Sequence, residues 1–363
     1  MTISEDINYI EVTLDETVLK QLGYDVNQED IYENTEINEI VQLVEFKKDG
    51  QYVTNFDIPA TYIYEGKNYK ITKIADGMFS FCSSLKCVTI PNSVTDIGKN
   101  AFSGCTLLNS ITIPDSVIYI RDSAFFCCSS LTSVIIPNSV KYIGDSAFGH
   151  CSSLTNITIP NSVKYIEDSA FKGCLSLTSV IIPDGVEKIG EESFKSCSSL
   201  TNLIIPNSVT DIGFMAFWYC SSLTNITIPN SVKYIGGCAF NHCSSLTNIT
   251  IPNSVKYIGF SAFEDCLSLT SVTIPDGIEK IDEEAFKGCS SLASIMIPNS
   301  VIKIGKEAFS DCKALKKLII PDSVIEIGEN AFKNVPHIEY NGSAEDPKDI
   351  LFIKHKWGAK KID

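Results

Sequence analysis

Histidine, tryptophan and clusters of positive charge are scarce in this chain. Only 4 histidines and 2 tryptophans occur among 363 residues. Lysine and arginine total 29 against 44 aspartates and glutamates, and they form no basic cluster. Without a basic face, the release of counterions that supplies most nucleic-acid affinity has no source. The composition therefore argues against a nucleic-acid partner.

Long apolar runs are also absent. No stretch of 18 apolar residues occurs, so we expect no membrane insertion. The first residues, Met-Thr-Ile-Ser-Glu-Asp-Ile-Asn, have neither the basic start nor the apolar stretch of a signal peptide, so the chain as written is expected in the cytoplasm. The net charge of −15 is uneven, because residues 1–57 hold 14 of the 44 acidic and 3 of the 29 basic side chains. The acidity belongs mostly to the N-terminal segment.

Arrangements that would support catalysis or metal binding are missing. His150 and His242 lie 92 residues apart, which is four repeats of the kind described below, or about 19 Å at the spacing of neighbouring strands. They cannot share a site. No Cys-x-x-Cys pair with nearby histidines suggests zinc. With no nucleophile beside a base, no carboxylate pair and no glycine-rich phosphate loop, we expect no enzyme, no cofactor and no metal.

The sequence does contain a repeat of 23 residues. The period is marked by eleven prolines: Pro91, Pro114, Pro137, Pro160, Pro183, Pro206, Pro229, Pro252, Pro275, Pro298 and Pro321. A fixed period of this length predicts stacked units that form one elongated solenoid, which we expect to be a monomer. We expect three parts: an acidic N-terminal segment and cap, the repeat array, and a C-terminal cap, at residues 1–57, 58–335 and 336–363.

Each column of the repeat has a predicted position. In one unit, Val134 and Ile136 alternate with polar residues, which predicts a strand that Pro137 ends. The apolar spacing that follows predicts a return path with about one helical turn near Asp145–His150. Cysteines recur with the same period, and stacked sulfurs in one column would stay about one coil apart, beyond the reach of a disulfide. We therefore expect buried, reduced thiols.

The irregular ends predict caps. Hairpins are expected to turn at Glu65-Gly66-Lys67 and at Lys48-Asp49-Gly50, and a short helix is expected at Asp15–Leu22. The rest of residues 1–38 is interpreted as a partly ordered acidic appendage. At the other end, apolar residues are expected to cover the last coil: Ile350–Ile353 and Trp357.

The unit Ile-Pro-Asn-Ser-Val-x-x-Ile-Gly-x-x-Ala-Phe-x-x-Cys-x-x-Leu resembles the BspA-like class of leucine-rich repeats over residues 58–335. The resemblance implies a right-handed horseshoe solenoid with a parallel β-sheet on its concave side and short helical turns on the return side. It also implies recognition or adhesion, because members include bacterial surface proteins that bind host matrix components. The resemblance therefore favours a protein that is located at the cell surface or secreted.

Alternation within the strands predicts which side chains leave the core on the concave side. They are polar, uncharged or β-branched, and they form the predicted binding face: Ser133, Ile135, Asn156, Thr158, Ser179, Ile181, Asn202, Ile204, Asn225, Thr227, Asn248 and Thr250. The alternative interpretation is that threonine and serine simply suit a solvated sheet. The isoleucines, with Met296 and Ile319 farther along, favour binding.

A second candidate surface lies away from the sheet. Aromatic and apolar residues occupy columns that other repeats fill with small or charged residues: Phe214, Met215, Trp218, Tyr219 and Phe260. An exposed apolar cluster often marks a contact site, but these residues could equally pack over a neighbouring turn. Lys-Tyr pairs such as Lys233-Tyr234 are interpreted as solvated surface. They recur because residues 138–195 and 230–287 are near copies.

These observations predict a non-enzymatic module that binds a protein through the concave sheet, including a host or extracellular-matrix protein. One alternative is a cytosolic scaffold for protein–protein interactions, which reduced thiols would suit. A third hypothesis is a surface that orders water or ice, because regularly spaced threonines lie on the sheet. The isoleucine and methionine interruptions count against that hypothesis.

Overall fold

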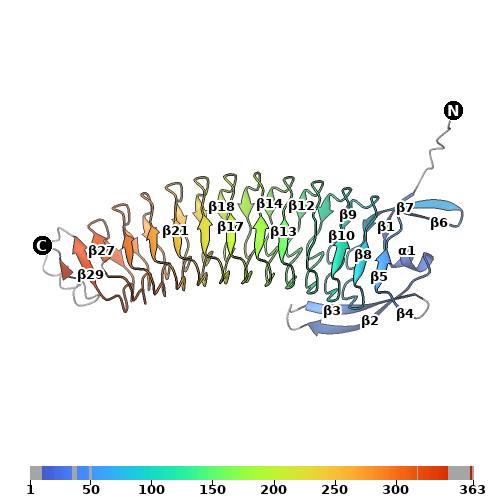
Figure 1. Cartoon of the computed structure of the whole chain (residues 1–363), viewed down its shortest axis with the longest axis horizontal. Helices are drawn as coiled ribbons and strands as arrows, with labels where there is room; N and C mark the ends of the chain where they lie inside the picture. The colour runs from blue at the N-terminus through green and yellow to red at the C-terminus, as the bar shows by residue number, and fades with distance from the viewer. Residues whose placement is uncertain (1–9, 35–38, 49–50, 317, 342–359, 362–363) are drawn as a thin grey trace, which may run out of the picture. The chain divides into compact units, whose positions relative to one another are not determined.

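The chain is a parallel β-solenoid in which each 23-residue repeat makes one coil. The computed structural model describes the backbone of residues 10–34, 39–48, 51–316, 318–341 and 360–361. Two compact units, Met1–Leu175 and Ser176–Asp363, are described in turn. In both, a typical coil contributes one strand to a long-strand sheet and one to a short-strand sheet (Figure 1). The predicted fold class is confirmed.

The unit Met1–Leu175 begins with elements outside the repeat. They are β1 (Ile10–Leu14), α1 (Glu16–Gln21), β2 (Asp25–Asn34), β3 (Glu39–Lys48), β4 (Gln51–Tyr52), β5 (Asn55–Asp57), β6 (Thr61–Tyr64) and β7 (Lys67–Ile74). Strands β6 and β7 form the predicted hairpin, in which Glu65 and Gly66 have positive φ. Strands β3 and β4 form the second hairpin. The predicted helix is α1, and the Asp15 carboxylate accepts a hydrogen bond from the Val18 N–H at 2.9 Å.

The interpretation of residues 1–38 as an appendage was wrong for two segments. Strand β1 pairs parallel with β7, and β2 pairs antiparallel with β3. Partners of β1 lie more than 50 residues away in the sequence, so its local pattern does not reveal them. Strand β5 pairs parallel with the first repeat strand, β8. The long-strand sheet therefore starts before residue 58, while the division into cap and array remains a prediction.

The coils of Met1–Leu175 supply short strands to both sheets. The long-strand sheet has β8 (Cys87–Thr89), β10 (Ser110–Thr112) and β13 (Asn156–Thr158), and the short-strand sheet has β9 (Asp96–Ile97), β11 (Tyr119–Ile120), β12 (Tyr142–Ile143) and β14 (Tyr165–Ile166). Strand pairing is interrupted in each, because β13 is not in the ladder of β5, β8 and β10, and β14 is not in that of β9, β11 and β12. Pairing joins residues one period apart, as in Val88 with Ile111. Ser133 contributes an isolated bridge to Asn156.

The coils of Ser176–Asp363 repeat the plan. The long-strand sheet has β15 (Ser179–Ile181), β17 (Asn202–Ile204), β19 (Asn225–Thr227), β21 (Asn248–Thr250), β23 (Ser271–Thr273), β25 (Ser294–Met296) and β27 (Leu318–Pro321). The short-strand sheet has β16 (Lys188–Ile189), β18 (Asp211–Ile212), β20 (Tyr234–Ile235), β22 (Tyr257–Ile258), β24 (Lys280–Ile281), β26 (Lys303–Ile304) and β28 (Glu326–Ile327). Strands β24, β26 and β28 form a ladder separate from β16 to β22, and β27 lies outside the ladder of β15 to β25.

At the C-terminal end, β27 pairs with β29 (Ile338–Asn341), and β29 pairs with β30 (Lys360–Lys361). The predicted covering residues Ile350–Ile353 and Trp357 lie outside the described residues. Within the described part of the chain, no helix has the length and apolar character needed to span a bilayer.

The core of each unit is a set of columns, one residue per coil. Phenylalanine rings stack through the interior: Phe217 and Phe240 have ring centroids 5.3 Å apart, and Phe240 and Phe263 have centroids 5.4 Å apart. All three side chains are fully buried. Alanine, leucine and cysteine columns are buried beside them. Because each ring covers its neighbour's face, one coil alone would expose half of its core.

The cysteine column is a ladder of thiol hydrogen bonds. The Cys243 Sγ donates to the Phe217 carbonyl oxygen, and the Cys266 Sγ to the Phe240 carbonyl oxygen, both at 3.2 Å. The same bond is made by Cys105, Cys128, Cys151, Cys174, Cys220, Cys289 and Cys312. Burial raises the pKa of the Cys174 thiol to about 12. As predicted, these nine side chains are buried thiols, and their protonation makes them unreactive.

The return path consists of tight turns, and the helical turn expected at Asp145–His150 is absent. The Ala147 N–H bonds to a carbonyl three residues back, whereas the Phe148 N–H donates to the carbonyl of Ala170 in the next coil. An α-helix needs its donors within its own segment, but here alternate donors pair between coils. Ser146, with φ of 53°, is one of the left-handed residues that turn the chain.

Candidate binding surfaces

The sheet face, defined as the outward side chains of the long-strand sheet, contains the first predicted site. In Ser176–Asp363 the three-residue strands β15 to β25 are exposed at both ends and buried in the middle, as alternation predicts. The predicted residues there are exposed: Ser179, Ile181, Asn202, Ile204, Asn225, Thr227, Asn248 and Thr250. In Met1–Leu175 the predicted residues are exposed too: Ser133, Ile135, Asn156 and Thr158.

The asparagine column of the sheet face is bonded to the chain itself through the threonines that precede it. The Thr224 Oγ1 donates to the carbonyl of Thr201 in the preceding coil at 3.2 Å, and the Thr247 Oγ1 bonds in the same way to Thr224. The Asn225 Nδ2 donates to the Thr224 Oγ1 at 3.3 Å. These bonds fix the direction of the asparagine side chains. The asparagine column and the threonines that precede it therefore have a structural role before any role in binding.

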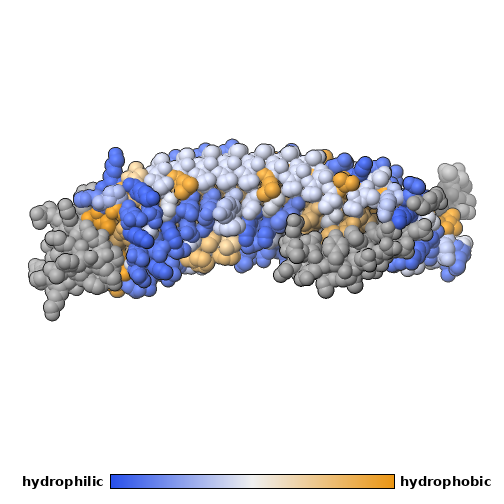
Figure 2. Space-filling model, turned by 90° about the horizontal axis from the view of Figure 1, so that it is seen from below, coloured by the Kyte–Doolittle hydropathy of each residue, from blue (hydrophilic) through white to orange (hydrophobic). Residues whose placement is uncertain are grey.

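The apolar positions of the sheet face have no such internal role. Ile181, Ile204 and Met296 are 62%, 78% and 75% exposed. Seen from below the view of Figure 1, the surface has a pale, weakly polar band with a few hydrophobic positions on it (Figure 2). Each such side chain would gain roughly 1.5–3 kcal/mol if a partner covered it fully. Neighbouring coils carry Thr227 and Thr250 in the same column, so the fold accepts a polar residue there.

The sheet face is hollowed at its C-terminal end. A cavity of about 840 Å³ lies between strands β25 and β27, and its lining includes Met296, Ile319, Pro321 and Ser323. Two of these, Met296 and Ile319, are exposed apolar residues of the column that contains Ile204. The cavity was not predicted, because the repeat pattern alone does not show where the sheet face is hollowed.

The predicted aromatic cluster divides into two groups. The rings of Phe214 and Phe260 lie 6.0 Å apart, although two coils separate them. Gly237 stands between them in the same column, and a Cβ atom there would come within 2.8 Å of the Phe260 ring. Glycine thus provides the space in which Phe260 lies. Phe260 remains 47% exposed.

The second group packs over neighbouring turns. Trp218 and Tyr219 meet edge to face with centroids 4.3 Å apart, and the Lys195 Nζ lies 4.5 Å from the centre of the Trp218 ring. The same Nζ lies 3.6 Å from the sulfur of Met215. The other side of Tyr219 stacks on His242 at 4.2 Å. For this group, packing over turns accounts for the residues without a ligand.

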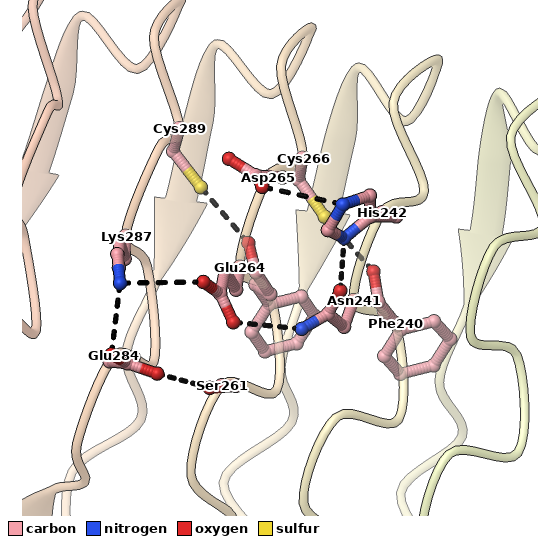
Figure 3. Close-up of polar contacts among 11 residues, drawn as sticks. Phe240, Asn241, His242, Ser261, Glu264, Asp265, Cys266, Glu284, Lys287 and Cys289 are labelled. Carbon is pink, nitrogen blue, oxygen red and sulfur yellow. Dashed lines mark hydrogen bonds and ion pairs between the residues drawn. The ribbon is translucent and has the colours of Figure 1, made fainter.

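A polar network that the sequence did not predict lies beside this group. The Asn241 Nδ2 donates to the Glu264 Oε2 at 2.9 Å, and the Lys287 Nζ lies 3.7 Å from Glu264 and 2.9 Å from Glu284 (Figure 3). The same Nζ lies 2.8 Å from Glu307. The Lys287 ammonium lowers the pKa of Glu307. Because one lysine joins carboxylates of three coils, the network holds the turns in register.

His242 belongs to the same face. Its Nε2 lies 3.5 Å from the Asp265 Oδ2, and its Nδ1 contacts the Asn241 Oδ1 (Figure 3). The sequence did contain a signal: Tyr219, His242 and Asp265 are each 23 residues apart and so share one column. Residues one period apart lie in neighbouring coils, so this spacing predicts the contacts of His242 with Tyr219 and Asp265. Among the described residues, no three His, Cys, Asp or Glu side chains are placed to hold a metal ion.

Comparison with known proteins identifies the repeat. The family model of a BspA type leucine rich repeat region (6 copies) matches residues 54–178, 119–228, 165–292 and 210–339. The chain belongs to the BspA-type leucine-rich repeat family. The predicted resemblance is confirmed. No curated protein matches the sequence.

Solved structures agree with this BspA-type fold. A leucine-rich repeat protein from Bacteroides ovatus is 26% identical with a TM-score of 0.70, over 94% of this chain and 98% of that one. A leucine rich cell surface protein from Faecalibacterium prausnitzii is 32% identical with a TM-score of 0.56, over 89% and 94%. The pneumococcal vaccine antigen PcpA, at 20% identity and a TM-score of 0.58 over 98% and 99%, shows likeness of fold alone.

Proposed function

We propose that this BspA-type protein is a non-enzymatic binding module that recognises another protein through the sheet face. The observation that carries the proposal is the exposure of Ile181, Ile204 and Met296 in a column where neighbouring coils have threonine. Apolar side chains at the centre of a polar surface are the usual anchors of a protein interface. The internally bonded asparagines and threonines around them supply an ordered polar rim.

The proposed partner is a protein outside the cell, such as a host or extracellular-matrix protein. Support comes from likeness to the leucine rich cell surface protein of F. prausnitzii. An uncharged face also suits a partner that binds by packing more than by charge. The aromatic group of Phe214 and Phe260 is a secondary candidate surface.

A cytosolic scaffold would use the same face. Reduced cysteines were the argument for that location, but nine of them are buried donors to carbonyl groups. Such thiols would persist in an oxidising compartment as well. They do not separate the two hypotheses. A water- or ice-ordering surface receives less support, because in Ser176–Asp363 the outer threonine column runs only from Thr227 through Thr250 to Thr273.

The test compares variants that convert the apolar positions to the residue of neighbouring coils. The full chain is immobilised and exposed to a panel of purified extracellular-matrix proteins, with binding followed by surface plasmon resonance. For a protein that binds, the double variant Ile181→Thr with Ile204→Thr is expected to weaken affinity about tenfold or more, since two anchors are lost.

The matched control is Lys141→Ala with Lys164→Ala, which changes exposed residues outside both candidate surfaces and should leave protein binding unchanged. If the isoleucine variants bind as the parent does, the sheet face is not the site. If no matrix protein binds, the proposed class of partner is wrong.

A further inference from the structure

The Lys-Tyr pairs of the short-strand sheet occur in two near copies, one in each unit. The copy in Met1–Leu175 contains Lys141-Tyr142 and Lys164-Tyr165, and the copy in Ser176–Asp363, 92 residues later, contains Lys233-Tyr234 and Lys256-Tyr257. All four lysines are exposed, and among the described residues none of the four is held in an ion pair. Their cations are the same in the two copies, so any difference must come from neighbouring residues.

In the first copy the pairs lie among carboxylates. The Tyr142 hydroxyl donates to the Asp122 Oδ1 at 3.2 Å. Burial, followed by the negative charges of Asp122, Glu167 and Asp145, raises the pKa of Tyr142 to about 12. An anion that approaches this copy meets charges of its own sign.

In the second copy those carboxylates are absent. Asp122, Asp145, Glu167 and Asp168 correspond, 92 residues later, to Phe214, Gly237, Gly259 and Phe260. Four negative charges are thus replaced by two aromatic rings and two glycines, and the rings meet above Gly237. Tyr234 and Tyr257 are about half exposed. One carboxylate remains beside it, because the Tyr257 hydroxyl donates to the Asp282 Oδ2 at 3.1 Å. The second copy is therefore less acidic and more aromatic than the first.

We propose that the second copy binds an oligosaccharide that carries carboxylates, such as a uronic acid polymer. The surface consists of Lys233, Tyr234, Lys256, Tyr257, Phe214 and Phe260, and is called the Lys-Tyr surface below. A uronic acid ring has C–H faces that pack on aromatic rings and a carboxylate that accepts charge-assisted hydrogen bonds from lysine. The aromatic rings are what distinguish this copy from the first, and without the four carboxylates its lysines face an anion with less repulsion.

Other anionic partners fit less well. An extended acidic peptide supplies carboxylates but no sugar ring whose C–H face packs on the exposed aromatic rings. A single-stranded nucleic acid needs a continuous basic groove, but here two lysines lie on a chain with a net charge of −15. The inference is independent of the sheet face, because the two surfaces share no residue.

The ligand test uses two defined hexasaccharides on the full chain by isothermal titration calorimetry. Hyaluronan hexasaccharide alternates glucuronate with N-acetylglucosamine, and chitohexaose contains N-acetylglucosamine without carboxylates. We expect hyaluronan to bind at least about tenfold more tightly, because only it can accept hydrogen bonds from both lysines as an anion. Added salt should weaken hyaluronan binding.

The variants exploit the two copies. Lys233→Ala with Lys256→Ala should weaken hyaluronan binding about tenfold or more, whereas Lys141→Ala with Lys164→Ala in the first copy should leave it unchanged. Phe214→Asp with Phe260→Asp gives the second copy the residues of the first. This pair should abolish binding while circular dichroism shows the parent's fold, because the first copy accommodates aspartate at both positions.

Three results would overturn the proposal: equal affinity for the two sugars, no binding of hyaluronan, or equal losses in both lysine pairs. Tighter binding of a dodecamer of deoxythymidine than of hyaluronan would also overturn it and reassign the surface to nucleic acid. None of these results bears on the sheet face, whose variants change other residues.

Discussion

The inward and outward columns of the same coils differ in how strictly they keep the 23-residue period. The inward phenylalanine column runs from Phe79 to Phe332 without substitution, and rings of neighbouring coils stack, as in Phe79 with Phe102 and Phe309 with Phe332. The outward column next to the Lys-Tyr pairs changes between aspartate, glutamate, glycine, lysine and phenylalanine. Stacking demands the same shape from every coil, but solvent does not. The interior therefore specifies the fold, and differences between coils on the outside are where binding specificity can arise.

Ionising the cysteine column is expected to disrupt the interior most strongly. Burial raises the pKa of the nine hydrogen-bonded thiols, as in Cys174 to about 12, while a thiol in the unfolded chain titrates at about 8.5. The folded state keeps protons that the unfolded state loses, so stability is fully present below about pH 8.5 and falls as the pH rises towards 12. Above the pKa of the unfolded thiol, each buried thiol lowers the free energy of unfolding by about 1.4 kcal/mol for each pH unit. Nine thiols together therefore lower it by on the order of 10 kcal/mol for each pH unit.

Circular dichroism at constant ionic strength should therefore show cooperative unfolding between about pH 9 and 11. Replacing Cys220 and Cys243 with alanine should move the midpoint to higher pH, since two titrating groups are gone. An unchanged midpoint in that variant would show that other groups drive alkaline unfolding.

A cavity in the phenylalanine column is the next largest disturbance. Phe240→Ala removes a fully buried ring that stacks on both Phe217 and Phe263, and it should lower the free energy of unfolding by about 3–5 kcal/mol in urea titrations. Phe260→Ala is the matched control, because that ring is 47% exposed. If the two variants lose equal stability, the separation between inward and outward columns does not hold.

The sequence predicted the inward columns of the fold better than the turns and the N-terminal strand. The period and apolar alternation identified the inward columns and both hairpins, because these depend on neighbours in the chain or one repeat away. The turns at residues such as Ser146 were predicted as helical, since the spacing does not show that alternate N–H groups donate to the next coil. Strand β1 was missed because it pairs with a strand more than 50 residues away.

The candidate sites were predicted less completely for a related reason. Alternation placed the sheet-face residues correctly on the outside, yet exposure alone does not identify a partner. The contacts of His242 with Tyr219 and Asp265 run across coils, so motifs sought along the chain could not show them. In a repeat protein, differences between equivalent positions of near copies, such as Asp122 and Phe214, show where the two surfaces differ.

One inward position departs from its column and offers a stabilising change. Ser193 takes the place of the alanine found in other coils, is fully buried, and its Oγ has no hydrogen-bond partner. Ser193→Ala should raise the free energy of unfolding by about 1–3 kcal/mol, because the cost of desolvating the hydroxyl disappears. The reverse change, Ala216→Ser, should lower it by a similar amount. A loss of stability in Ser193→Ala would mean that the hydroxyl has a partner such as buried water.

The smallest effect is expected at the outward positions of strand β17, where the comparison is sharpest. Ile204 is 78% exposed and pairs with Thr227 in the next coil, whereas Leu203, one residue earlier, is buried. Ile204→Thr should change the free energy of unfolding by no more than about 0.5 kcal/mol, and Leu203→Thr should cost several times more. Urea titrations of the two variants measure the difference within a single strand. A loss above about 1 kcal/mol for Ile204→Thr would show that this side chain packs within the coil and would remove the main support for the sheet-face proposal. A negligible loss would mean that stability does not account for an isoleucine in a threonine column, as the sheet-face proposal expects.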